Sequence, residues 1–236
     1  MKRFFTTIFC VFAGMPVYAF DFALTEAEFR SWDNRCKKAF SAVGAGRNSG
    51  FFHNMSKQQH TEAQLFAEGA GAAWHYCAGV IYLQRAGVST GQEREGNLKR
   101  AVNEMRFTIN KIRPEHQWYP EMHINYARAL YTHDNKSEAF TVLNRLISTH
   151  PTNSLPYTAL AYYLKKENQL EQAIAAMQQA PELLLNESAE LNYFLGWYLM
   201  EADKTEAAVV HAKRAYELDY PVPTLRQRLA AKGLSW

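Results

Sequence analysis

The stretch PEMHINYARALYTHDNKSEAFTVLNRLISTHP, from Pro120 to Pro151, decides the fold because the chain repeats its pattern further along. The segment SLPYTALAYYLKKENQLEQAIAAMQQA, residues 154–180, matches it in residue character after a shift of 34 residues. A third copy, AELNYFLGWYLMEADKTEAAVVHAKRAYELDYP, lies 35 residues beyond the second. A fixed period of this size is typical of repeat proteins, in which each unit buries its apolar face only by stacking on its neighbours.

Each copy consists of two halves in which apolar residues recur at i, i+3, i+4 and i+7, the spacing of one helix face. The polar segments THDNKSE, KKENQLE and EADKTE separate the halves and predict turns. Small residues recur at one place in each half, where a large side chain would hold two crossing helices apart: Ala127, Ala161 and Gly196, then Ala139, Ala173 and Ala208. The sequence therefore predicts an all-α solenoid of helical hairpins and needs no strand.

This pattern resembles the tetratricopeptide repeat (TPR) family, which carries a large residue, then Leu-Gly or Leu-Ala, then Tyr, and later Ala and Pro. Over residues 72–221, the resemblance implies four TPR-like helical hairpins. The helices of the first would be HYCAGVIYLQRA and GNLKRAVNEMRFTINKI. The segment between them, GVSTGQEREG from Gly87 to Gly96, is too long for the family and predicts a surface loop with a specific role.

Helices are also predicted on both sides of the repeats. TEAEFRSWDNRCKKAF predicts one amphipathic helix that opens with a capping box from Thr25 to Glu28. SKQQHTEAQLFAEGAG predicts another, ending at Gly69 or Gly71, so that residues 20–71 form an N-terminal helical extension. Residues 222–236, with the segment TLRQRLAAKGLSW, predict the solvated capping helix that an open solenoid needs.

The first 19 residues have the pattern of a signal peptide. Lys2 and Arg3 precede an apolar run over residues 4–17, and Val17-Tyr18-Ala19 fits a cleavage site. We therefore expect an exported, periplasmic chain that begins at Phe20, and the alternative is a retained membrane anchor. No later segment is apolar enough to predict a transmembrane helix.

Composition and charge restrict the possible partners and the redox state. The chain has 236 residues, of which 47% are hydrophobic, so it can bury a large core. Its formal charge of +3 falls to +1 without Lys2 and Arg3, which gives no basis for nucleic-acid binding. Cleavage would also remove Cys10 and leave Cys36 and Cys77, which predict one disulfide in an exported protein. Two buried free thiols are the alternative.

Neither a catalytic nor a metal site is expected. His75 and Cys77 lie two residues apart in AAWHYCAGVIYLQRA, so on a helix they point to different faces and cannot act as a pair. The sequence has no HExxH or CxxC motif to hold a metal, and GAGRNSG lacks the Lys-Ser/Thr ending of a phosphate loop. We expect no enzymatic activity and no cofactor.

The concave face is the better candidate, because the resemblance implies that the first helices of the hairpins line a groove. Aromatic rings there would supply contact area at low entropic cost, and basic side chains would hold carboxylates. The alternative is that several of these rings pack between repeats. By spacing, the predicted groove residues are Asn125, Arg128, Tyr131, Tyr162, Lys165, Tyr193 and Trp197. Asn125, Arg128 and Lys165 imitate only in part the residues with which some TPR proteins grip terminal carboxylates, so that activity is not inferred.

Three classes of function remain open. The first is a TPR scaffold that holds a protein or peptide partner in the cell envelope of a Gram-negative bacterium and supports assembly or export of a surface structure. The second is an accessory protein that binds carbohydrate or peptidoglycan, with Tyr162, Tyr193 and Trp197 stacked on sugar rings; a polysaccharide would then be the partner. The third, an enzyme, has no nucleophile or carboxylate pair to support it.

Overall fold

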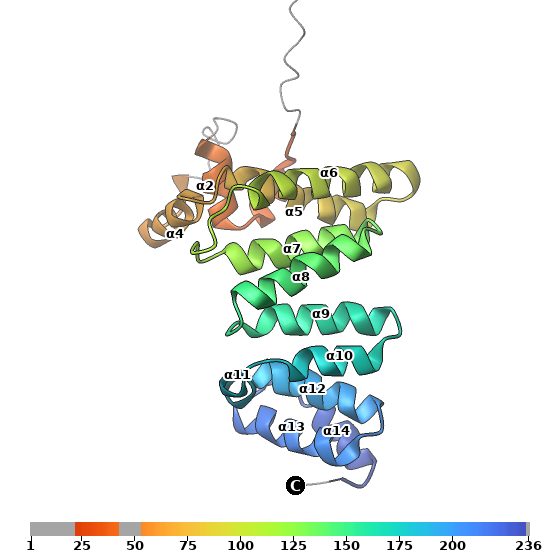
Figure 1. The fold of residues 1–236 in the computed structure, drawn as a ribbon. Coiled ribbons are helices and arrows are strands. Elements are labelled where there is room, and N and C mark those ends of the chain that lie inside the picture. Colours follow the sequence, from red (N-terminus) through yellow and green to blue (C-terminus); the bar gives the residue numbers. More distant parts are fainter. Residues whose placement is uncertain (1–21, 43–52, 235–236) are drawn as a thin grey trace, which may run out of the picture.

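The computed structural model describes residues 22–42 and 53–234, and within these ranges it contains helices and no strands. The predicted signal peptide, residues 1–19, lies outside the described residues, and so does Phe20. The fold is the predicted all-α solenoid of TPR-type hairpins (Figure 1). The hairpins pair α5 (Ala73–Val88) with α6 (Gly91–Ile109), α7 (Tyr119–Thr132) with α8 (Lys136–Thr149), α9 (Ser154–Lys166) with α10 (Leu170–Gln178), and α12 (Ala189–Glu201) with α13 (Thr205–Glu217).

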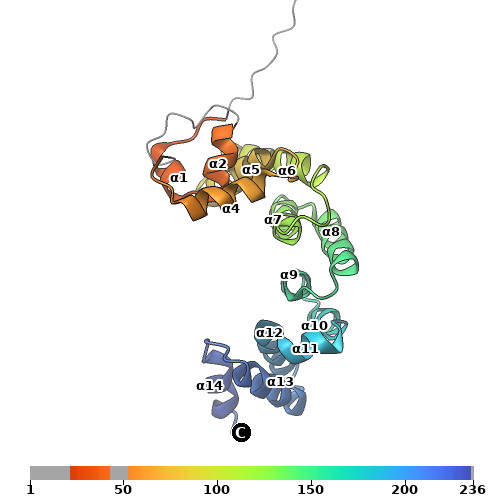
Figure 2. The same cartoon turned by 90° about the vertical axis from the view of Figure 1, so that its left-hand side faces the viewer.

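The hairpins stack along a curve, and this curvature creates an inner and an outer side. Helices α7, α9 and α12 lie along the inside of the curve, whereas α8, α10 and α13 lie along the outside (Figure 2). The first helix of each of these hairpins therefore lines the concave face, as predicted.

Small residues allow the two helices of each hairpin to approach closely. A methyl group added at Gly79 would lie 2.6 Å from Cγ of Met105, and one added at Gly196 would lie 3.1 Å from the backbone nitrogen of Ala212. Ala127 and Ala161 hold the equivalent places in the other two hairpins, and both are fully buried. The recurrence of small residues thus reflects backbone-to-backbone packing.

The turns within the last three hairpins share one backbone geometry. Asp134, Asn168 and Asp203 have φ values of 63°, 61° and 56°, in the left-handed region that Asn and Asp tolerate better than most residues. After Asp134, the N–H of Asn135 donates to the carbonyl of Leu130 at 2.8 Å and closes the end of α7. The predicted polar turns are therefore specific helix-ending motifs.

The prediction of a surface loop from Gly87 to Gly96 is wrong. Helix α5 continues to Val88 and α6 begins at Gly91, so only two residues connect them. The first six residues of α6 are solvent-exposed and carry no apolar stripe that would have revealed a helix. Glu95 in this first part of α6 lies 2.9 Å from Nε2 of His133, which ties the extended helix to the next hairpin.

The N-terminal extension contains α1 (Glu26–Ser31), α2 (Asn34–Ala42) and α4 (Lys57–Ala67). The capping box at Thr25 is confirmed, but the single helix predicted after it is wrong, because the chain forms α1 and α2 instead. Trp32 is extended, and the side chain of Asp33 accepts from the backbone N–H of Arg35 at 2.8 Å. This contact starts a new helix at the break.

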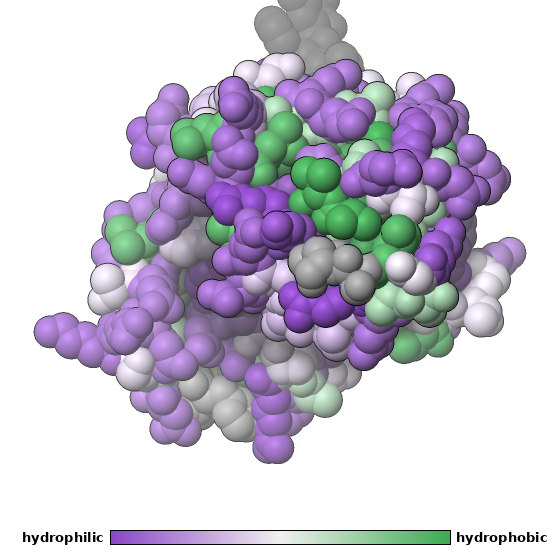
Figure 3. All heavy atoms as spheres, turned by 90° about the horizontal axis from the view of Figure 1, so that it is seen from below, coloured by the Kyte–Doolittle hydropathy of each residue, from purple (hydrophilic) through white to green (hydrophobic). Residues whose placement is uncertain are grey.

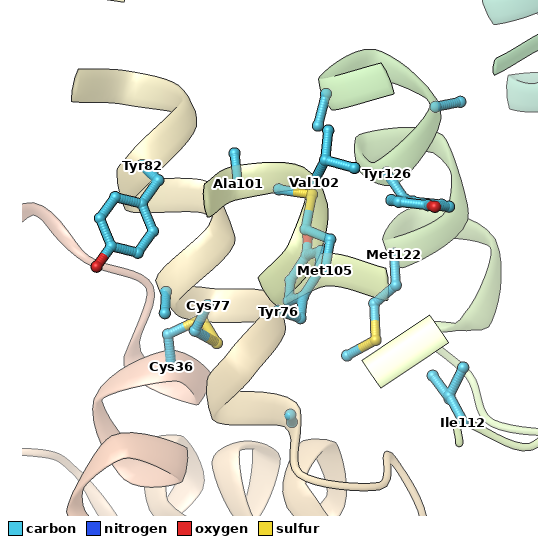
Figure 4. Close-up of a cluster of buried hydrophobic side chains, with 14 of the residues drawn as sticks. Cys36, Tyr76, Cys77, Tyr82, Ala101, Val102, Met105, Ile112, Met122 and Tyr126 are labelled. Carbon is cyan, nitrogen blue, oxygen red and sulfur yellow. A yellow bond between two sulfur atoms is a disulfide. The ribbon is translucent and has the colours of Figure 1, made fainter. Parts of the chain in front are cut away.

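A disulfide between Cys36 and Cys77 joins this extension to the first hairpin, as predicted. The two Cα atoms are 5.5 Å apart, and both residues are buried. Figure 4 shows the bond within the buried cluster that also contains Tyr76 and Tyr82.

The C-terminal end is closed by α14 (Thr224–Ala231), as predicted. Leu225 and Leu229 of this helix are fully buried, while hydrophilic residues cover much of this end of the molecule (Figure 3). A short helix that the repeat pattern did not predict, α11 (Glu182–Glu187), joins the third and fourth hairpins. Among the described residues, no helix has the length and apolar character needed to cross a bilayer.

Candidate partner-binding site

A cleft lies on the concave face, mainly between α9 and α12. It consists of two adjoining pockets of about 320 Å³ and 440 Å³ that share Tyr162, Phe194 and Tyr198. The first pocket also reaches α7, and the second extends to the C-terminal end of α9. We call the two together the aromatic cleft, which is lined by Glu121, Ile124, Asn125, Leu155, Thr158, Ala159, Tyr162, Tyr163, Lys165, Lys166, Glu190, Tyr193, Phe194, Trp197 and Tyr198.

The repeat explains why these side chains gather. Positions 34 or 35 residues apart occupy equivalent places on successive first helices, so they form rows across the concave face. One such row contains Arg128, Tyr162 and Trp197, and a second runs through Asn125, Ala159 and Phe194. The small side chain of Ala159 leaves room between its larger neighbours, and the cleft opens there.

Five of the seven predicted groove residues line the cleft, namely Asn125, Tyr162, Lys165, Tyr193 and Trp197. Arg128 is exposed in the same row as Tyr162 but lines neither pocket. Tyr131 packs between repeats: its ring stacks on Tyr163 with centroids 4.2 Å apart, and its hydroxyl donates to Glu167 at 2.6 Å. Tyr131 is therefore one of the rings that pack between repeats instead of lining the groove.

The residues at one end of the cleft support one another. Tyr193 is only 5% exposed and stacks on Tyr220, with ring centroids 4.3 Å apart. The guanidinium of Arg228 lies 4.6 Å from the centre of the Trp197 ring. The Trp197 indole nitrogen also donates to Glu201 at 2.7 Å. These contacts fix the rings in place and leave little of Tyr193 free to meet a ligand.

The repeat pattern did not single out several side chains that line the cleft. One of them, Leu155, is 44% exposed and presents apolar surface in the first pocket. Tyr162, which the repeat pattern did predict, is 47% exposed and lines both pockets. Burial raises the pKa of Tyr163 and of Tyr198 to about 12, so both rings stay neutral across the physiological range. The cleft is therefore mostly apolar, with charged groups only near its ends.

The N-terminal extension supports the rim of the cleft on α7. The guanidinium of Arg35 contacts Glu121 at 3.0 Å and Asp33 at 2.8 Å, and it lies about 5 Å from the ring centres of Phe66 and Trp118. Glu121 thereby receives a fixed position at the edge of the first pocket.

A second contact in the same region reaches Asn125, whose side-chain amide donates to the hydroxyl of Tyr76 at 2.7 Å. The first hairpin thus helps to shape a cleft that lies beyond it.

The structure gives His75 and Cys77 separate roles. Cys77 is held in the disulfide, and Nδ1 of His75 lies 2.6 Å from a carboxylate oxygen of Glu104. The His75 ring lies between Trp74 and Phe107, at centroid distances of 3.8 Å and 4.0 Å. Within residues 22–42 and 53–234, no group of three His, Cys, Asp or Glu side chains could hold a metal ion.

The buried imidazole of His123 on α7 should make the stability of the fold depend on pH. Burial lowers its pKa from 6.5 to about 4, and its Nδ1–H donates to the carbonyl of Tyr119 at 2.8 Å. As pH falls below 6.5, the unfolded chain binds a proton that the folded chain rejects until about pH 4. This group's stabilisation is therefore complete above pH 6.5 and is lost toward pH 4.

Between pH 7 and pH 5 we expect His123 to account for a fall of about 2 kcal/mol in the free energy of unfolding. Urea denaturation at both pH values measures this fall. His123→Gln should remove most of it, because an amide does not titrate. An equal pH dependence in both proteins would contradict this assignment.

Comparisons with known proteins add a likeness of architecture. No protein-family model matches the sequence, and no curated protein matches it. Among solved structures, the chain is similar to MamA 41-end from Desulfovibrio magneticus RS-1, with 18% identity and a TM-score of 0.47. It is also similar to the MamA RS-1 ArsTM double mutant, with 20% identity and a TM-score of 0.46. Each match covers 84% of this chain and 97% of the other. This likeness assigns no ligand to the cleft.

Proposed function

We propose that this chain is an exported TPR-like scaffold that holds a protein partner in the aromatic cleft. The observation that carries the proposal is the cleft itself, a concave, mostly apolar site whose aromatic rings are held in place by the surrounding repeats. Preformed apolar clefts with a few polar groups are typical binding sites, because little conformational entropy is lost when they are filled.

The proposed location is the periplasm of a Gram-negative bacterium. The residues before Phe20 have the charge and apolar pattern of a signal peptide. A buried disulfide agrees with export, because disulfides persist in oxidising compartments. In that compartment, we propose, the scaffold supports the assembly or export of an envelope or surface structure.

A protein partner fits the cleft better than a polysaccharide does. Sugar stacking needs an open ring face, but Tyr193 is stacked on Tyr220 and Trp197 is covered by Arg228. Only Tyr162, of the three rings predicted to bind sugar, is substantially exposed. Side chains of a peptide can instead enter the pockets between the rings.

Charged substitutions in the cleft test this proposal. The double variant Leu155→Asp/Tyr162→Asp should reduce capture of the partner at least about tenfold, because it places two carboxylates where apolar side chains would dock. The melting temperature should change little, since both side chains are about half exposed. The measurement is quantitative co-purification from the cells that make the protein, after crosslinking.

The control is Val88→Asp, at the end of α5, because this side chain is 90% exposed and lies outside the cleft. Its partner capture should equal that of the unaltered protein. Full capture by a folded Leu155→Asp/Tyr162→Asp variant would place the binding surface elsewhere.

A further inference from the structure

The aromatic cleft has an uncompensated carboxylate at one end. Glu190 is half-buried at the start of α12, and its side chain has no ion-pair or hydrogen-bond partner among the residues that the structure describes. Burial raises the pKa of Glu190, because nothing nearby offsets the loss of water around its charge. Glu121, at the same end, already has an ion-pair partner in Arg35. Glu190 is thus the acceptor that remains for an incoming cation.

The opposite end carries uncompensated positive charge. Lys165 is paired with Glu201 at 2.5 Å, and its ammonium lies 4.8 Å from the centre of the Tyr198 ring. Lys166 is exposed, with its ammonium 5.0 Å from the Tyr162 ring centre, and it pairs with no carboxylate in the described ranges. Lys166 can therefore receive an anionic group without breaking an existing ion pair.

The distance between these ends fixes the length of the occupant. Leu155, which lines the same pocket as Glu190, and Lys166 mark the two ends of the cleft on α9. They are eleven residues apart on one helix, which corresponds to about 16 Å. An extended peptide advances about 3.3–3.6 Å per residue, so about five residues cover this length.

We propose that the cleft binds an extended segment of a partner protein in which a basic and an acidic residue flank about three apolar residues. The basic side chain pairs with Glu190, and the acidic one meets Lys166. The apolar side chains between them lie on the rings of Tyr162 and Phe194, which line both pockets. The inference rests on the proposed function and specifies the chemistry of its ligand. A neutral glycan would match neither charge.

Four capped pentapeptides test the charge pattern: Lys-Leu-Phe-Leu-Glu, the same peptide with Gln in place of Lys, with Gln in place of Glu, and with Gln at both ends. Each is titrated into the intact protein by isothermal calorimetry at low and high salt. The doubly charged peptide should bind tightest, and each neutral end should weaken binding about five- to tenfold. High salt should reduce these differences.

Two variants assign each preference to its residue. Glu190→Gln should abolish the preference for Lys over Gln and keep the preference for Glu over Gln. Lys166→Gln should do the reverse. The control is Glu206→Gln, an exposed carboxylate in the first turn of α13 that should change neither preference. If Glu190→Gln weakens all four peptides equally, or leaves the preference for Lys intact, the charge assignment is wrong.

Failure of this inference and failure of the proposed function give different results. If none of the peptides binds, but a partner protein crosslinks at Tyr162 in the cell, the charge pattern is refuted and the scaffold remains. If the peptides bind as expected, but no protein crosslinks at Tyr162, the cleft recognises the pattern and the proposed scaffold function is refuted.

Discussion

Reduction of the Cys36–Cys77 disulfide is expected to lower the free energy of unfolding by about 4 kcal/mol. The bond closes a loop of 41 residues, and breaking it restores to the unfolded chain the conformational freedom that the loop removes. Urea denaturation of the oxidised protein, with and without a thiol-free reductant, measures this change. The midpoint should fall clearly on reduction.

The double variant Cys36→Ala/Cys77→Ala is the control for this experiment. Its unfolding should not respond to reductant, which separates loss of the bond from any other effect of the reductant. Equal midpoints for the oxidised and reduced protein would show that the link from α2 to α5 contributes nothing to stability.

Ala161→Leu on α9 is expected to lower the free energy of unfolding by about 1–3 kcal/mol. Ala161 is fully buried in the same cluster as Ala173 and Met177 of α10, and it occupies the place that Gly196 occupies in the next hairpin. A longer side chain must push the two helices of the hairpin apart. The measurement is the urea midpoint of the variant against that of the unaltered chain.

Ala159→Leu is a matched control two residues away on the same helix. Ala159 is half-buried and faces the aromatic cleft, so a leucine there extends into open space. We expect a change in stability of less than about 0.5 kcal/mol, together with weaker partner capture. Equal losses of stability at both positions would contradict the close helix crossing at Ala161.

The repeat made the fold predictable because equivalent residues face equivalent constraints. A small residue is needed wherever two helices of a hairpin cross, so Ala127, Ala161 and Gly196 recur at a fixed period and can be read without a structure. The prediction failed where a helix boundary depends on a single local contact. The break at Trp32 depends on one side-chain contact from Asp33, and that contact competes with continued helix in a segment whose apolar pattern looks unbroken.

The candidate site was only partly predictable, for a different reason. The repeat period predicted that Tyr162 and Trp197 occupy equivalent places on the concave face. The same shift of 35 residues relates Ala159 to Phe194, so it could also have identified Phe194 as a residue of that face. Whether a ring faces the cleft or a neighbouring repeat depends on the local helix rotation, as Tyr131 shows by stacking on Tyr163. The sequence could not single out Glu190, because only the structure shows that this carboxylate has no ion-pair or hydrogen-bond partner among the described residues.

Site-specific photo-crosslinking in the cell tests the central claim, that the aromatic cleft holds a protein partner. A photoreactive amino acid replaces Tyr162 in one strain and Val88 in another, and crosslinked products are identified by mass spectrometry. We expect one dominant protein adduct from position 162 that is missing from position 88. The same adducts from both positions, or none from position 162 in a folded protein, would contradict it.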